Sequence, residues 1–195
     1  MAKAAKINLE VLQGRTFSYT LRPGQSRLSY RQVTAATQAA PCVLTVPGHD
    51  IPNEWAFRIS NVRGMTELNA DRDYIATVLD PGSIELNDVN AAGFRPYQSG
   101  GVIAYSTPVD LSGFAGRMQV RPRVDSSDVL LDLTTENGGI VIDVSGYAVT
   151  IQIPALQTAG IDWLEGVYDI ELESADGIVS ALAAGSVKVL REVTR

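Results

Sequence analysis

The sequence predicts an all-β protein in which a split β-sandwich carries an inserted, small antiparallel β-barrel. Apolar and acidic side chains alternate with a period of two residues in Tyr168–Glu173, which is typical of a strand half-buried on a core. Similar alternations occur at both ends of the chain, in residues 1–29 and 107–195, whereas residues 30–106 contain shorter strand-like pieces separated by denser Gly and Pro signals. Because two lone N-terminal strands would be marginal without partners, we expect them to pair with the C-terminal block.

Composition and charge exclude several functional classes. The 195 residues carry a formal charge of −6 and no Lys/Arg cluster, which argues against nucleic-acid binding. No apolar run approaches the roughly 20 residues that span a bilayer, and the N-terminus has no hydrophobic signal core, so we expect neither membrane insertion nor a signal peptide. The single cysteine, Cys42, excludes an internal disulfide and leaves too few thiols for a zinc site. We expect no cofactor and no metal.

The stretch Gly166–Glu173 organises the C-terminal block. Its apolar side chains fall on one strand face and its carboxylates on the other, apart from Val167, which is out of phase. Asp176-Gly177 is a tight-turn signal, and the apolar positions resume at Ile178, so the pattern predicts a hairpin. A separate last strand is predicted over 185–190.

The remaining flanking elements follow the same period. Residues 7–11 and 17–21 predict two short strands before a turn at 22–26 that contains Pro and Gly. Further strands are predicted around 117–121, 131–133, 140–142 and 149–153. Residues 154–160 predict the only helix, of at most two turns, with Pro at its start and Gly at its end. Trp163 is predicted to plug the core of the sandwich.

Five or six short strands are predicted in the middle segment. Turn signals this close together fit a small antiparallel barrel or a compact sheet. The strand-like pieces are Val33-Thr34, Cys42–Val46, Trp55–Ile59, Tyr74–Val78 and Ser83–Leu86.

The charged side chains of two strands are the main candidate site. Asp169, Glu171 and Glu173 share one strand face at a spacing of about 7 Å, and Arg117 and Arg121 share another. A solvated face is the simplest interpretation, and an interaction surface for a charged partner is the second. A paired-carboxylate hydrolase is a third, which would need a partner group from a neighbouring strand.

Three further candidates have structural interpretations that are simpler than chemical ones. His49 beside Asp50 resembles an oriented base, but no recognised nucleophile elbow accompanies it, so a role in the turn is favoured. Cys42 lies in the apolar phase of its strand and is predicted to be a buried structural thiol. Residues 69–73 carry oxygen donors at alternate positions like the start of a calcium loop, but Arg72 interrupts them and the Gly and distant Glu of that motif are missing.

The C-terminal block resembles a family of small structural proteins from tails of siphophages and their prophages. The resemblance covers about ninety residues plus the N-terminal strands. It rests on the segments Val109–Phe114, Met118–Arg121, Leu131–Ile140, Trp163–Leu172, Gly185–Val187 and Val193–Arg195. It implies an immunoglobulin-like β-sandwich similar to the N-terminal domain of upper baseplate proteins, which join the tail tip to fibres or receptor-binding proteins.

The middle segment resembles a small barrel module of phage tail proteins. Its fold is similar to the first catalytic-cysteine half-domain of ubiquitin-activating enzymes, a half-domain that does not hold the reactive cysteine, so Cys42 does not inherit that role. The residues that carry this resemblance are Thr37–Pro41, Pro47–His49, Gly64–Asn69 and Tyr97–Gly101. The module more often has Gly at the position of Asp50, so we expect the turn there to differ, because a non-Gly residue disfavours positive φ.

These resemblances imply a non-enzymatic component of a bacteriophage tail tip or baseplate, made in the host cytoplasm and present in several copies per virion. Its partners would be other tail or baseplate proteins and, at its outer end, a tail fibre or a host-surface glycan. The alternative is a carbohydrate-binding module whose exposed aromatic side chains, Trp55, Tyr74 and Tyr97, form a platform for sugars.

Overall fold

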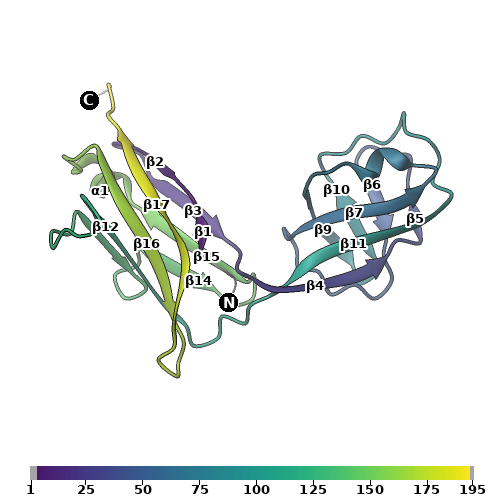
Figure 1. The fold of residues 1–195 in the computed structure, drawn as a ribbon. Coiled ribbons are helices and arrows are strands. Elements are labelled where there is room, and N and C mark those ends of the chain that lie inside the picture. The colour runs from purple at the N-terminus through teal and green to yellow at the C-terminus, as the bar shows by residue number, and fades with distance from the viewer. Residues whose placement is uncertain (1–3, 194–195) are drawn as a thin grey trace. The chain divides into compact units, whose positions relative to one another are not determined.

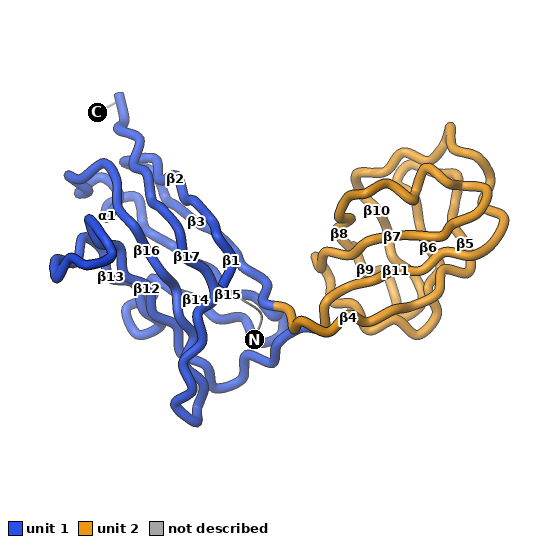
Figure 2. The backbone as a smooth tube through the Cα atoms, viewed as in Figure 1, with its two compact units in different colours: residues 1–23, 108–195 blue, residues 24–107 orange. Residues whose placement is uncertain are grey.

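The structure, a computed structural model, describes residues 4–193 and is almost entirely β (Figure 1). The chain divides into two compact units, coloured separately in Figure 2: unit 1 is formed by Met1–Pro23 and Pro108–Arg195, and unit 2 by Gly24–Thr107. Thr194 and Arg195, the end of the last segment of the resemblance, lie outside the described residues. Within residues 4–193, the structure has no helix with the length and apolar character needed to cross a membrane.

Unit 1 consists of two sheets that share one apolar core. The larger sheet has the order β1-β17-β16-β12-β13, and β2 also pairs with β17. Its strands are β1 (Ala5–Lys6), β2 (Leu9–Leu12), β12 (Ala115–Arg121), β13 (Leu131–Thr134), β16 (Glu165–Glu173) and β17 (Val179–Leu190). The smaller sheet has the order β14-β15-β3, with β14 (Ile140–Asp143), β15 (Ala148–Ile153) and β3 (Phe17–Leu21).

The strand predicted around Tyr168 lies at the centre of the larger sheet. Tyr168, Ile170 and Leu172 are buried in the core, as the alternation predicts, while the side chains between them face outward. The predicted hairpin is confirmed, because β16 and β17 are antiparallel and Gly177 adopts φ +76° in the turn. The separate last strand is wrong: β17 is one strand of 12 residues, which continues past a register shift opposite Ile170 and Glu171.

The N-terminal strands join the C-terminal ones. β1 and β2 run parallel to β17, and β3 runs antiparallel to β15. The chain passes very close to β17 between β1 and β2, where the amide of Ile7 donates a 3.0 Å hydrogen bond to the Ala184 carbonyl. A Cβ on Gly185 would lie 1.8 Å from the Ile7 carbonyl oxygen, so only glycine fits at that crossing.

The only α-helix within residues 4–193, α1 (Ala155–Ala159), follows the prediction, with Pro154 and Gly160 as its flanking residues. Thr158 is fully buried and its hydroxyl donates to the Arg15 carbonyl at 2.8 Å, which ties the helix to the N-terminal segment. Trp163 is only partly buried against the core, so it covers the core rather than plugging it.

Unit 2 contains two four-stranded sheets. Their orders are β4-β11-β7-β8 and β5-β6-β10-β9. The strands are β4 (Gly24–Gln32), β5 (Ala35–Ala36), β6 (Cys42–Thr45), β7 (Ala56–Arg63), β8 (Tyr74–Ile75), β9 (Thr77–Asp80), β10 (Ser83–Leu86) and β11 (Ser99–Pro108), with a short 3₁₀ turn, η1 (Thr66–Asn69). The boundary expected between residues 29 and 30 lies instead after Pro23, because Gly24–Gln32 form one strand hydrogen-bonded to β11.

Candidate functional site

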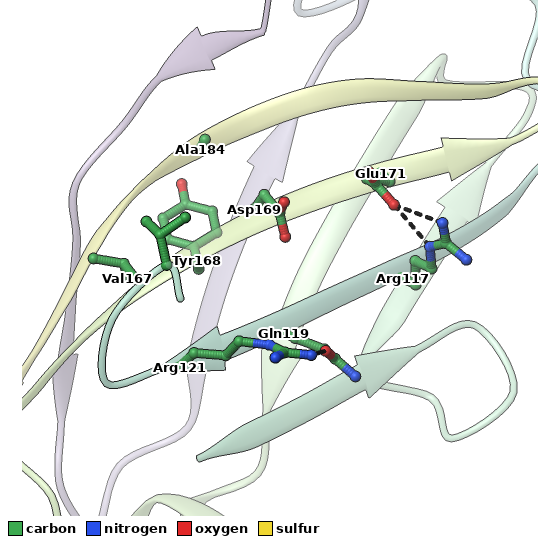
Figure 3. A pocket seen from close by; sticks show the side chains of 9 residues that line it. Arg117, Gln119, Arg121, Val167, Tyr168, Asp169, Glu171 and Ala184 are labelled. Atoms are coloured by element: carbon green, nitrogen blue, oxygen red, sulfur yellow. Dashed lines mark hydrogen bonds and ion pairs between the residues drawn. The ribbon is translucent and has the colours of Figure 1, made fainter. Parts of the chain in front are cut away.

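Strand pairing brings the predicted basic and acidic side chains together on the outer face of the larger sheet (Figure 3). β12 and β16 are antiparallel neighbours, and their register places Arg117 opposite Glu171, Gln119 opposite Asp169 and Arg121 opposite Val167. Because Met118 and Ile170 of the same strands point into the core, these charged side chains face away from it. Glu173 lies further along β16, opposite Ala115, and does not line the hollow described below.

Arg117 and Glu171 form the main ion pair of this face. The Nε and Nη2 atoms of Arg117 both lie 2.8 Å from Oε2 of Glu171. This hydrogen bond, followed by the charge of Glu171, raises the pKa of the Arg117 guanidinium. Both side chains remain substantially exposed, so the pair orients the two groups rather than supporting the fold.

Gln119 and Arg121 extend the row in the other direction. Arg121 Nη2 donates to Gln119 Oε1 at 2.7 Å, and Gln119 Nε2 donates to Asp132 Oδ1 of β13 at 2.9 Å. Arg121 Nη1 also donates to the Ser126 carbonyl at 2.6 Å. The sequence placed Gln119 on the same strand face as the two arginines, but nothing in it indicated Asp132 or Ser126, since their positions depend on strand register and on a loop.

A shallow hollow lies over β16 beside this row. Its polar side is formed by the β12 side chains and Asp169, and its apolar side by Val124, Val167 and Ala184. Val124 is 88% exposed, and Val167 and Ala184 are half-buried. The hollow combines ordered charges with exposed apolar surface, a combination that suits contact with another protein.

The same geometry does not suit a paired-carboxylate hydrolase. Such an enzyme keeps one carboxyl group protonated by surrounding it with apolar atoms. Glu171 instead accepts hydrogen bonds from Arg117, and Asp169 is exposed beside it on the outer face.

The predicted platform of aromatic side chains is wrong. Trp55, just before β7, and Tyr74, in β8, are each only 2% exposed and belong to the buried core of unit 2. Trp55 Nε1 donates to the Ser106 carbonyl at 2.8 Å and the Tyr74 hydroxyl to the Leu68 carbonyl at 3.0 Å. Tyr97 is half-buried, and its hydroxyl is hydrogen-bonded to the carbonyls of Val33 and Gly100. These three rings therefore present no shared surface to a sugar.

His49 and Cys42 occupy structural positions. His49 is buried and its Nε2 lies 2.9 Å from the Asp80 carbonyl oxygen, which links the turn after β6 to the end of β9. Cys42 is fully buried, and its thiol donates to the Thr37 carbonyl at 3.3 Å. Burial raises the pKa of the Cys42 thiol, which makes it a poor nucleophile.

The turn containing Asp50 has its positive φ at a glycine, as expected for a non-Gly residue at position 50. The positive φ belongs to Gly48, at +65°, and Asp50 is not among the residues with positive φ. Asp50 accepts hydrogen bonds from Arg31 Nη2, at 2.8 Å, and from the Tyr105 hydroxyl. The Tyr105 hydrogen bond holds the pKa of Asp50 below its usual range, and burial raises the pKa of Tyr105 to about 12.

In the segment that resembles a calcium loop, two carboxylates bind an arginine side chain from β7. Arg58 Nη1 lies 2.6 Å from Asp71 Oδ1 and its Nε 2.9 Å from Asp73 Oδ1, so the guanidinium forms ion pairs with both carboxylates. The Asn69 side chain is engaged with the backbone of Val62. Among the residues that the structure describes, no group of three or more His, Cys, Asp or Glu side chains is placed to hold a metal ion.

Comparison with known proteins adds no relative to this description. No protein-family model matches the chain, and no curated protein matches its sequence significantly.

Proposed function

We propose that this chain is a non-enzymatic structural component of a bacteriophage tail tip or baseplate. In this proposal it is made in the host cytoplasm, is built into the virion tail in several copies, docks to other tail proteins and links to or decorates the fibre or receptor-binding parts. The proposal starts from the resemblance of the segments around Leu131–Ile140 and Trp163–Leu172 to tail proteins of siphophages and prophages.

The proposal also assigns a specific fold to each unit. Unit 1 would be an immunoglobulin-like sandwich, and unit 2 a small barrel inserted into it. Two sheets around one core in unit 1, and two four-stranded sheets in unit 2, are compatible with that description. An insertion of this kind leaves the host sandwich intact, since both ends of the inserted unit belong to one connection.

The observation that carries the proposal is the ordered charged row on the outer face of β12 and β16. Arg117 is fixed by Glu171, and Arg121 by Gln119 and the Ser126 carbonyl, so the charges are held in place before any partner arrives. Pre-ordered side chains lose less entropy on binding, and a fixed pattern of opposite charges selects one register of docking. A component that repeats in a symmetric tail needs that selectivity.

Electron microscopy of intact particles tests the proposed location. Antibody fragments raised against unit 1 are mixed with particles purified from the cells that encode the chain. We expect label on the tail and none on the capsid. Label that is confined to the soluble fraction of the lysate, or absent from tails, would contradict the proposal.

A complementation experiment tests the proposed docking face. Particles are assembled in cells that supply either the wild-type chain or the double variant Arg117→Glu/Glu171→Arg, which keeps an ion pair but reverses its direction. We expect incorporation of the double variant into tails to fall by about tenfold. Arg123→Glu is the matched control in the same unit, because Arg123 and Asp125 are almost fully exposed and contribute little. If the double variant were incorporated as well as Arg123→Glu, the charged row would not be needed for docking.

A further inference from the structure

The hollow over β16 is lined by one cation and one anion that no opposite charge of the chain compensates, Arg121 and Asp169. Arg121 is half-buried, and its two hydrogen bonds go to neutral acceptors, the Ser126 carbonyl and Oε1 of Gln119. Arginine carries five N–H donors in a planar fork, so three remain for a partner. A carboxylate matches this fork best, because it accepts two parallel N–H bonds. The Arg121 end of the hollow therefore suits an acidic side chain.

Asp169 is the uncompensated anion. Its side chain is exposed and makes no hydrogen bond or ion pair with another residue in the range 4–193. Its charge acts on Arg117 from a distance, but that guanidinium is bonded to Glu171. Figure 3 accordingly shows a dashed line at Arg117 and none at Asp169. This part of the hollow suits a basic side chain.

The register of β12 and β16 sets the spacing between the two charges. Gln119 lies opposite Asp169 and Arg121 opposite Val167, so Arg121 and Asp169 are diagonal neighbours about 7–8 Å apart. In an extended chain, side chains two residues apart share one face at a spacing of about 7 Å. An extended segment with an acidic and a basic residue separated by one position therefore meets both groups at once.

Apolar side chains complete the hollow. Val124, Val167 and Ala184 line it beside the charges. A partner that covers them removes apolar surface from water and lowers the effective dielectric around the ion pairs, which strengthens them. The partner is therefore expected to carry an apolar side chain next to its charged ones.

We propose that this hollow binds an extended segment of another tail protein that carries a carboxylate and, two residues away, a lysine or arginine, beside an apolar side chain. The carboxylate pairs with Arg121 and the cation with Asp169. This inference rests on the proposed function, because it specifies the chemistry of the partner that docks on the charged row.

A second copy of this chain fits the hollow less well. The segment Arg123-Val124-Asp125, next to the hollow, has a basic and an acidic residue separated by one position. Arg123 Nε lies 3.3 Å from Asp125 Oδ1, so these two charges compensate each other within the chain. Self-association is an outcome that the experiment must distinguish.

Nuclear magnetic resonance titration of the full chain with synthetic peptides tests the proposal. Two capped peptides contain Val-Ser-Glu-Ser-Lys or the reverse order, since a partner strand can run in either direction. A third contains Val-Ser-Glu-Lys-Ser, which has the same composition but places the lysine on the other strand face. We expect one of the first two to bind with a dissociation constant of about 1 mM, to shift the resonances of Arg121 and Asp169, and to bind more weakly as salt is added. The third should bind at least about threefold more weakly.

Substitutions in the hollow provide a matched comparison. Arg121→Gln and Asp169→Asn should each weaken peptide binding by about threefold or more. Glu173→Gln is the control, because Glu173 lies on the same face of β16 but outside the hollow. Asp169→Lys should prefer a peptide containing Val-Ser-Glu-Ser-Glu over the lysine peptide, which a variant that only misfolds could not do.

Several results would overturn the proposal. No shift with any peptide at about 10 mM, or equal binding of the rearranged peptide, would show that the hollow does not recognise this charge spacing. Shifts of the same resonances with chain concentration alone would identify a second copy as the occupant. Because the titration uses the purified chain, its failure would leave the tail location standing, and absence of the chain from tails would leave a positive titration standing.

Discussion

The amide of Val109 donates a 3.0 Å hydrogen bond to the carbonyl of Pro23, and this bond closes unit 1 at the point where the chain leaves and returns. Residues 24–107 are therefore inserted between two backbone groups that already touch. Unit 1 should therefore fold with or without the insertion, because a very short connection can join its two segments.

Each unit should fold without the other. Replacing residues 24–107 by Gly-Gly should leave unit 1 with a cooperative thermal transition, because its two sheets already share a complete core. Residues 24–107 alone should also unfold cooperatively. Calorimetry and amide dispersion in nuclear magnetic resonance spectra measure both. Loss of dispersion in the shortened unit 1 would show that the insertion is needed for folding.

Gly185→Ala should destabilise unit 1. The added Cβ would lie 1.8 Å from the backbone carbonyl oxygen of Ile7, so either the N-terminal segment or β17 must move. We expect a loss of about 1–3 kcal/mol in the free energy of unfolding, measured by urea denaturation. Gly160→Ala is the matched control in the same unit, because its φ is −80° and its added Cβ meets only ordinary contacts. Equal effects of the two substitutions would contradict the close crossing.

Stability should fall at alkaline pH through Tyr105. Burial, with the hydrogen bond to Asp50, raises the pKa of Tyr105 to about 12, against about 10 in an unfolded chain. Below pH 10 the Tyr105 hydroxyl is protonated in both the folded and the unfolded state, so its contribution to the free energy of unfolding is complete. Between about pH 10 and 12 the unfolded state binds fewer protons, so the free energy of unfolding decreases as pH rises.

Thermal unfolding measured from pH 9 to 12 checks this dependence. Tyr105→Phe has no hydroxyl to ionise and should show a shallower alkaline decline than the wild type. Tyr168 provides a parallel case in unit 1, because burial raises its pKa to about 12 as well. Identical pH profiles for the wild type and Tyr105→Phe would count against the buried hydroxyl as a cause.

The Cys42 thiol should be unreactive in the folded protein. It is fully buried and burial raises its pKa, so both access and thiolate formation are suppressed. Reaction with Ellman's reagent at pH 8 should be at least about a hundredfold slower in buffer than in 6 M guanidinium chloride. Rapid labelling of the native chain would show that the strand carrying Cys42 opens easily.

The two-residue period in the sequence correctly predicted which side chains share each strand face. It identified the faces of β16 and the exposed row of Arg117 and Arg121, because side chains alternate along a strand wherever it lies in a sheet. The short helix was predicted from a different signal, the flanking residues Pro154 and Gly160. The two-residue period did not identify the burial of Trp55 or Tyr74, since alternation separates two faces without saying which one meets a core.

By itself, the sequence determined an all-β chain, the members of each strand face and the carboxylates of one outer row. Tertiary structure alone decided that β2 runs parallel to β17, that Arg58 lies between Asp71 and Asp73, and that Glu171 faces Arg117. The physical reason is the distance along the chain over which each effect acts. Alternation and turn chemistry depend on residues that are close in sequence. Strand register pairs residues that are far apart in sequence, and it depends on the packing of the whole sheet.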